Sequence, residues 1–241
     1  MLNAFTRTEM LLGKEALDKL QNAKVAVFGI GGVGSFTAEA LARTGVGSLV
    51  LIDSDNVCIT NINRQIHATH NTVGQPKVEV MRDRLLTINP NLDITIHQSI
   101  YNAETADMLL QPDYGYVVDA IDTVTSKIDL AVRCPEMGLP LISSMGAANK
   151  LDPTKLQVAD IYKTSVCPLA KVMRHELKKR RVKKLKVVYS TELPLKPLPL
   201  PVDPNAPAAT FSKRQPPASV SFVPSVAGLI LASQVVKHFI E

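Results

Sequence analysis

The chain has 241 residues, a formal net charge of +5 and 46% hydrophobic residues, enough to bury the core of one large domain. It lacks both the roughly 18 to 20 uninterrupted apolar residues of a membrane span and the pattern of a signal peptide, so we expect a cytoplasmic protein outside the membrane. Its three cysteines, Cys58, Cys134 and Cys167, lie far apart. This spacing predicts reduced thiols and argues against a disulfide framework or a zinc site built from close pairs.

Apolar periodicity predicts a first helix over about residues 8–20, followed by an alternation of strands and helices. Strands are expected at 24–29, 48–53, 93–97, 115–119 and 140–144, and helices at 32–44, 76–88, 103–110 and 125–138. Such alternation implies right-handed crossovers and a mainly parallel sheet with helices on both faces. We therefore predict an α/β protein with a Rossmann-like three-layer fold.

The pattern changes after Gly146. A strand at 156–161, a basic helix from about Pro168 and a strand at 186–190 are expected to extend the sheet at its C-terminal end. Residues 191–217 contain eight of the sixteen prolines, which predicts an extended or mobile crossover. The apolar segment 225–239 predicts a buried terminal helix that is too short to anchor in a membrane. We expect residues 1–241 to form a single domain.

Positive charge is concentrated in one window, the basic segment 171–186. Eight Lys or Arg residues lie between Arg174 and Lys186 against one acid, Glu176, and the rest of the chain has more acidic than basic residues. A local excess of this kind is typical of a polyanion-binding face, although a solvated helix end is the alternative. The residues predicted to bind phosphates are Arg174, Lys178, Lys179, Arg180, Arg181, Lys183 and Lys184.

A glycine motif, Gly29-x-Gly31-x-x-Gly34, ends the first strand, and Asp53 closes the next apolar run. The first glycine permits a tight turn, the second permits close approach of a phosphate, and the third lets the helix pack against the strand. Asp53 lies at the distance expected for a carboxylate that binds a ribose hydroxyl. These residues predict a nucleotide-binding βαβ unit.

Three charged residues indicate which nucleotide chemistry follows. Arg64 and Lys77 come after the second strand and Asp122 after the fourth, so all three are expected beside the phosphates at the carboxyl edge of the sheet. A carboxylate near clustered phosphates indicates a bridging Mg²⁺. Surface ion pairs are the alternative role of Arg64 and Lys77, but a dehydrogenase that binds NAD needs none of the three. Together they favour cleavage of ATP at its α-phosphate.

Successive segments of the chain resemble the signatures of the ubiquitin-activating-enzyme-like adenylation family, which includes the ThiF and MoeB adenylyltransferases. These segments are residues 25–35, 52–57, 61–65, 73–78, 88–90 and 117–123. Within the family, residues 40–47, 55–68 and 151–161 resemble the branch of tRNA threonylcarbamoyladenosine dehydratases.

The resemblance implies a set of site residues. Arg64 and Lys77 would stabilise charge at the α-phosphate, and Asp122 would bind Mg²⁺ through ATP. Arg7 matches an arginine that reaches into the partner subunit's site in relatives, which implies a homodimer and a catalytic role for Arg7. The implied ATP contacts are Gly29, Gly31, Gly32, Gly34, Asp53, Asp55, Asn61, Arg64, Gln65, Lys77 and Asp122.

The implied activity is ATP-dependent cyclisation of N6-threonylcarbamoyladenosine in tRNA through an acyl-adenylate. The alternative is an adenylyltransferase that activates the C-terminal glycine of a ubiquitin-like sulfur-carrier protein, and the lack of zinc-binding CxxC pairs counts against it. A non-catalytic nucleic-acid-binding module would explain the basic segment alone. A sulfur-transfer partner and the role of Cys167 are left open by the sequence.

Overall fold

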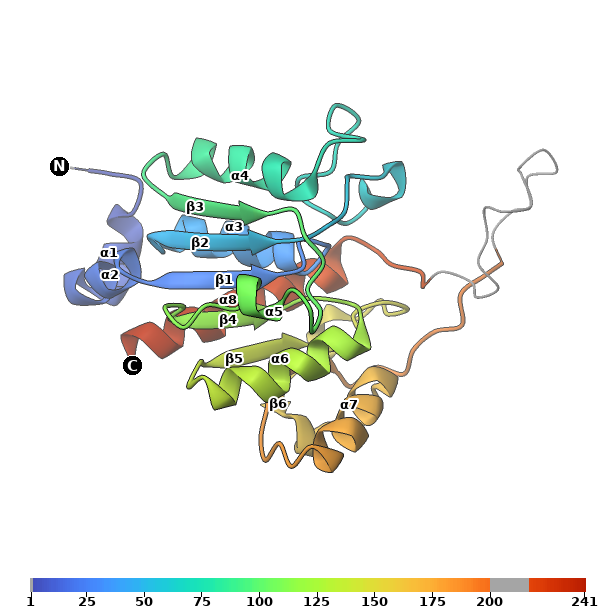
Figure 1. The fold of residues 1–241 in the computed structure, drawn as a ribbon. Coiled ribbons are helices and arrows are strands. Elements are labelled where there is room, and N and C mark those ends of the chain that lie inside the picture. The colour runs from blue at the N-terminus through green and yellow to red at the C-terminus, as the bar shows by residue number, and fades with distance from the viewer. Residues whose placement is uncertain (1, 200–216) are drawn as a thin grey trace.

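The computed structural model describes residues 2–199 and 217–241, and its described strands form one sheet of seven (Figure 1). The strand order is β3-β2-β1-β4-β5-β7-β6, in which only β6 runs antiparallel to its neighbour, β7. This confirms the Rossmann-like α/β fold and its extension at the C-terminal end. The strands are β1 (Lys24–Phe28), β2 (Ser48–Ile52), β3 (Asp93–His97), β4 (Tyr116–Asp119), β5 (Leu141–Ser144), β6 (Leu156–Asp160) and β7 (Lys186–Ser190).

Helices cover both faces of the sheet because alternate strand residues point to opposite sides. In β1, Val25 and Val27 pack with α3 (Gly34–Thr44), α4 (Lys77–Ile88) and α8 (Phe222–Ile240). Ala26 and Phe28 pack on the opposite face with α5 (Ala106–Leu109) and α6 (Val124–Glu136), and α7 (Pro168–Lys179) continues that layer over β7. Short 3₁₀ helices lie at η1 (Ile59–Asn61), η2 (Pro153–Lys155) and η3 (Ile161–Lys163).

The predicted first helix is two helices. Gly13 has a φ of 85° and separates α1 (Thr6–Leu12) from α2 (Lys14–Gln21). A glycine adopts this backbone conformation without the steric cost of a Cβ, so the chain turns there although the apolar spacing continues. α2 buries Leu17 and Leu20, whereas α1 buries no residue. Both helices lie at the amino ends of the central strands (Figure 1).

The terminal helix α8 is longer than predicted. It has 19 residues and is long and apolar enough to cross a membrane by length and composition, so the argument from length was wrong. Seven of its residues are buried in this fold, so one face of the helix packs as predicted, and its other residues are partly or fully exposed. At Gly228 the helix approaches α3 closely: a Cβ there would lie 2.3 Å from the Val33 carbonyl oxygen. Thr37 donates a hydrogen bond to the Gly228 carbonyl at 3.0 Å.

The predicted mobile crossover at 191–217 falls mainly on residues 200–216, which lie outside the described residues. Its described ends, residues 191–199 and 217–221, contain no helix or strand.

Candidate nucleotide-binding site

Loops that follow β1, β2, β4 and β5 enclose a cavity of about 650 Å³ at the carboxyl edge of the sheet. β1 lies between β2 and β4, and the chain order reverses there. In open α/β sheets, ligands bind outside the carboxyl ends of the strands at such a switch point. The cavity therefore lies where the fold class places its ligands.

The glycine turn after β1 is shaped by contacts that exclude side chains. Gly29 has a φ of +89°, and a Cβ there would lie 2.7 Å from the Ala120 carbonyl oxygen. A Cβ on Gly34 would lie 1.8 Å from the carbonyl oxygen of Gly29. Gly29, Gly31 and Gly32 line the cavity, whereas Gly34 lies behind the turn. The third glycine of the motif thus packs helix against strand, and the other glycines border the ligand space.

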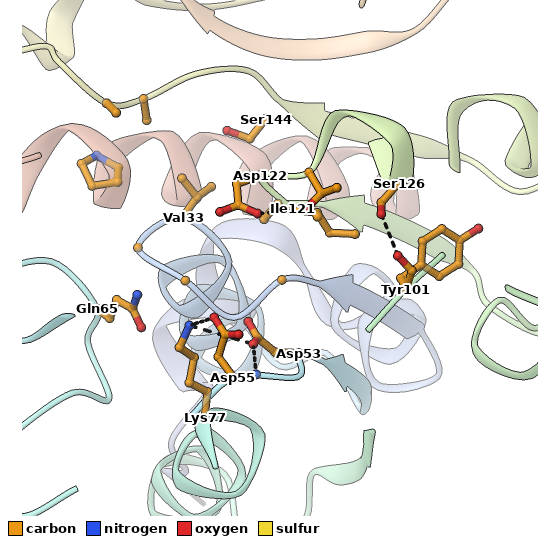
Figure 2. A pocket seen from close by; sticks show the side chains of 18 of the residues that line it. Val33, Asp53, Asp55, Gln65, Lys77, Tyr101, Ile121, Asp122, Ser126 and Ser144 are labelled. Carbon is orange, nitrogen blue, oxygen red and sulfur yellow. Dashed lines mark hydrogen bonds and ion pairs between the residues drawn. The ribbon is translucent and has the colours of Figure 1, made fainter. Parts of the chain in front are cut away.

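Asp53, Asp55 and Lys77 lie together on one side of the cavity (Figure 2). The Lys77 ammonium is 2.7 Å from Asp55 and 3.9 Å from Asp53, and the lysine is only 5% exposed. Asp53 accepts hydrogen bonds from the backbone amides of Ile30 and Asp55 at 2.6 and 2.9 Å. Burial raises the pKa of the Asp53 carboxyl, against the opposing charge of Lys77. Lys77 is therefore a buried cation beside the glycine turn and not a surface ion pair.

Residues 61–65 supply a second wall. Arg64 lines the cavity and donates to the Thr60 carbonyl at 2.9 Å and to Asn63 Oδ1 at 3.0 Å. Asn61 is buried and accepts a hydrogen bond from the Cys58 amide at 3.0 Å. Gln65 lies beside Gly31, and its buried Oε1 has no hydrogen-bond partner among the described residues. A buried amide without a partner at a cavity wall is typical of a site completed by a ligand.

Asp122 faces this cluster from the loop after β4 (Figure 2). It is exposed, and Thr123 Oγ1 lies 3.4 Å from one of its oxygens. Within residues 2–199 and 217–241, no group of three or more His, Cys, Asp or Glu residues is placed to hold a metal. A lone carboxylate does fit a Mg²⁺ ion whose other ligands are phosphate oxygens and water, since Mg²⁺ keeps several waters in nucleotide sites.

Sequence reasoning missed the ion pair beneath this loop. Lys127 Nζ lies 2.9 Å from Asp119 Oδ2, and both side chains are fully buried. The same ammonium donates to the Ile121 carbonyl at 3.0 Å. The apolar face of α6, on which Lys127 lies between Val124 and Ile128, was the available signal, because a lysine on such a face requires a buried partner.

Other predicted residues lie away from the cavity. Arg7 is exposed on α1, at the opposite edge of the sheet. Cys167 is buried, with its sulfur 3.9 Å from the position of a Cβ on Gly146, and so lies behind the cavity wall. Cys58 is the one exposed thiol, and hydrogen bonding from Thr60 lowers its pKa.

The fold and this cavity define a Rossmann-like protein with a nucleotide site that combines a glycine turn, a ribose-type carboxylate and buried positive charge. The chain belongs to the ThiF family, which it matches over residues 5–241.

Comparison with known proteins narrows the class. The chain is 48% identical over 245 residues to tRNA threonylcarbamoyladenosine dehydratase of Bacillus subtilis, covering 100% of this chain and 96% of the relative. Crystal structures of E. coli tRNA N6-threonylcarbamoyladenosine dehydratase, TcdA, are similar in fold and 36% identical, covering 98% of this chain and 93% of theirs. The TM-score is 0.87 for the complex with AMP and 0.86 for the complex with ATP. Molybdopterin-synthase adenylyltransferase of E. coli is 38% identical over 141 residues, 58% of this chain and 54% of that protein.

Buried His67 generates a pH prediction. It is 2% exposed, and neither ring nitrogen has a hydrogen-bond partner among the residues described. Burial, together with the nearby positive charges of Lys77 and Arg84, lowers its pKa from 6.5 to about 4. Between these values the unfolded chain binds a proton that the folded chain does not, so stability should fall as the pH drops from 6.5 towards 4.

His67→Phe should remove the part of the pH-dependent loss of stability that is due to this histidine. In urea unfolding at pH 7 and pH 5, the variant should lose less stability between the two conditions than the native chain does. His70→Gln, at an exposed histidine, is the control and should leave the difference unchanged. Equal losses in the native chain and in His67→Phe would contradict the assignment.

Proposed function

We propose that this protein is an ATP-dependent tRNA threonylcarbamoyladenosine dehydratase. The observation that carries the proposal is the joining of the glycine turn, Asp53, buried Lys77, Arg64 and Asp122 around one cavity. The full-length similarity to the B. subtilis dehydratase and the ATP complex of the E. coli enzyme support the same activity.

The reaction has two steps. A carboxylate oxygen of the threonyl group attacks the α-phosphorus of ATP, and the bond to the β-phosphate breaks to release pyrophosphate. An atom of the neighbouring carbamoyl group then attacks the activated acyl carbon, AMP leaves and a proton is lost, so the nucleoside loses one water overall. The protein contributes positioning and charge stabilisation, because adenylation itself supplies the leaving group.

Residues of the cavity divide this work. Asp53 binds the ribose, the glycine turn and Asn61 hold the phosphate chain, and Gln65 uses its unpaired Oε1 to bind a donor of the ligand. Arg64 and Lys77 stabilise the charge that develops at the α-phosphate. To do so, the Lys77 ammonium leaves its ion pair with Asp55 and contacts the phosphate. Asp122 would hold Mg²⁺ together with the phosphates, and the metal would supply positive charge opposite the phosphate oxygens.

AMP formation tests the activity. The protein should release AMP from ATP when tRNA carrying N6-threonylcarbamoyladenosine is present and not with unmodified tRNA. Lys77→Met should lower this turnover by about two to three orders of magnitude, the range for loss of one charge contact in a transition state. Lys24→Met is the matched control, because Lys24 also pairs with an aspartate at 2.7 Å but at the amino edge of the sheet. Near-normal turnover by Lys77→Met with saturating substrates would contradict its role.

The alternative, an adenylyltransferase for a ubiquitin-like sulfur-carrier protein, has weaker support. The adenylyltransferase of E. coli covers 58% of this chain, against 100% for the B. subtilis dehydratase. AMP formation elicited by such a carrier and not by tRNA would favour it. A sulfur-transfer partner of the dehydratase stays a prediction, for which exposed Cys58 is the accessible thiol.

The protein is proposed to act as a homodimer in which Arg7 enters the site of the partner subunit. Arg7 lies on a helix whose Met10 and Leu11 are 81% and 83% exposed, and adjacent exposed apolar side chains mark an interaction surface. The position of Arg7 at the edge opposite its own cavity requires a second subunit for any catalytic contact.

Complementation tests this arrangement. Mixing Arg7→Ala subunits with Asp122→Ala subunits should recover part of the AMP-forming activity, because one of the two hybrid sites then has both groups intact. Each variant alone should be impaired. Absence of recovery in verified heterodimers would place Arg7 outside the partner's site.

The tRNA is proposed to contact the basic segment, which borders a second groove. This groove of about 920 Å³ lies at the amino ends of β4 and β5 and is lined by Arg180, Arg181, Lys183, Lys184 and Lys186. Three cations of the segment are engaged within the protein: Arg174 donates to Thr164, and Lys179 and Arg180 pair with Glu176 at 2.8 and 2.7 Å. Arg181, Lys183 and Lys184 form no ion pair with any described residue, so they are the stronger candidates for phosphate contacts.

Two charge-matched double variants test this surface. Arg181→Ala with Lys183→Ala should raise the KM for tRNA and reduce the salt dependence of tRNA affinity by roughly one unit per lost phosphate contact. Lys179→Ala with Arg180→Ala removes the same charge from groups already paired with Glu176 and should have a smaller effect. ATP affinity should stay constant in both. Unchanged tRNA affinity and salt slope in the first variant would move the tRNA surface elsewhere.

A further inference from the structure

Both described ends of the Pro-rich crossover are bound by one residue, Asn149. The Leu195 amide donates to the Asn149 carbonyl at 2.8 Å. The Ala218 amide donates to Asn149 Oδ1 at 2.8 Å, and the Asn149 amide donates to the Ala218 carbonyl at 2.8 Å. Asn149 therefore joins three segments: the loop after β5, the outgoing end of the crossover and its returning end.

The backbone at Asn149 suits this role. Its φ of 59° lies in the left-handed region, which asparagine tolerates better than most residues because its short polar side chain bonds locally. Glu192 adds a second connection, since its buried carboxylate accepts hydrogen bonds from the Leu151 and Asp152 amides at 3.0 and 2.9 Å. The loop after β5 is thus bonded to the described ends of the crossover at residues 149, 151 and 152.

The same network reaches the predicted phosphate-binding arginine. Asn63 Nδ2 donates to the Ser219 carbonyl at 3.0 Å, and Arg64 Nη1 donates to Asn63 Oδ1 at 3.0 Å. A continuous path of bonds therefore runs from Arg64 through Asn63 and residues 218–219 to Asn149.

These contacts hold the side of the cavity that carries none of the predicted nucleotide-binding residues. Asp53 and Lys77 belong to the side after β2, and the glycine turn to β1. The other side, after β5, is lined by residues 144–148 together with Pro217 and Ser219, and Ser144 lies beyond Asp122 from the Asp53 cluster (Figure 2). The modified nucleoside, whose carboxylate accepts the adenylyl group, can therefore bind on this side of the cavity.

Among the described residues, three backbone amides on that side of the cavity are free to donate to a ligand. The amides of Gly146, Ala147 and Ala148 have no hydrogen-bond acceptor in the part of the chain that the structure describes, and all three residues line the cavity. Successive unpaired amides suit oxygen acceptors with negative charge. The threonyl carboxylate and the carbamoyl oxygen of the modified nucleoside are acceptors of this kind.

We propose that Asn149 is a positioning residue for the tRNA nucleoside: it holds residues 217–219 and the amides of residues 146–148 as the wall on which the threonylcarbamoyl group lies. The inference rests on the proposed dehydratase function. Asn149 itself does not line the cavity, so its effect passes through the segments that it binds.

Two substitutions separate the side-chain bond from the backbone conformation. Asn149→Gly accepts a positive φ but lacks the acceptor for Ala218, whereas Asn149→Asp keeps an acceptor at this position. Asn149→Gly should raise the KM for N6-threonylcarbamoyladenosine-containing tRNA by about five- to tenfold, as expected for one lost hydrogen bond. The KM for ATP should change by less than about twofold, since the nucleotide side keeps its contacts. Asn149→Asp should restore a KM for tRNA close to the native value.

Asn89→Ala is the control, because Asn89 Oδ1 also accepts from a backbone amide, that of Asn91 at 3.2 Å, at the far end of α4. It should leave both KM values unchanged. An unchanged KM for tRNA in Asn149→Gly, or an equal rise in both KM values, would overturn the inference.

Hydrogen exchange distinguishes failure of the inference from failure of the proposed function. The Ala218 amide, which loses its acceptor, should exchange faster in Asn149→Gly than in the native protein and in Asn89→Ala, whereas the Leu195 amide keeps the backbone carbonyl of residue 149 as its acceptor. Unchanged exchange would overturn the role of Asn149 whatever the substrate is. If the native protein formed no AMP with the modified tRNA, the proposed function would fail and the acceptor assigned to this wall would fall with it, even with faster exchange.

Discussion

The buried ion pair between Asp119 and Lys127 is the contact on which the carboxyl edge of the sheet depends. Both side chains are fully buried, and an unpaired charge at such a position costs several kcal/mol, about 3 to 5 when one partner is removed. Asp119 is satisfied by Lys127, by the Ser143 hydroxyl and by the Ile121 amide. These donors come from α6, from β5 and from the loop after β4. Satisfying one carboxylate therefore fixes the loop that carries Asp122.

This constraint extends to the nucleotide turn through the backbone. Ala120 follows Asp119 directly, and its carbonyl lies where a Cβ on Gly29 would be 2.7 Å away. Gly34 in turn approaches the carbonyl of Gly29. The ends of β1 and β4 and the start of α3 thus approach one another mainly through their backbones. The glycines are required by this approach of three backbones as much as by the ligand, so loss of the Asp119 pair would disturb the turn as well as the loop after β4.

Periodicity and glycine placement were sufficient to predict most strands and helices, because buried parallel strands are short apolar runs and each helix begins after a turn. They failed at Gly13, where the spacing of Leu11, Leu12 and Leu17 runs through a break in the backbone. They also failed for Lys127, since a pairing between a strand end and a helix eight residues later leaves no periodic trace. The hydrogen bonds of Asn149 could not be predicted for the same reason, because its partners at 195 and 218 are distant in sequence. Charge counting found the basic segment, but only geometry shows that Glu176 and Thr164 engage three of its cations.

The last helix connects the nucleotide side of the cavity with the side that the proposed acceptor occupies. α8 packs on α3 so closely that Gly228 contacts the Val33 carbonyl, and Thr37 bonds back to Gly228. Because α3 begins at the glycine turn, α8 is held against the element that carries the nucleotide site. Pro224, at its amino-terminal end, lines the cavity, and residues 217–219 lie immediately before the helix. The position of residues 217–219 in the proposed acceptor wall is thereby tied to α3, although the two are far apart in sequence, so a shift of α3 would move both the nucleotide side and this part of the acceptor side of the cavity.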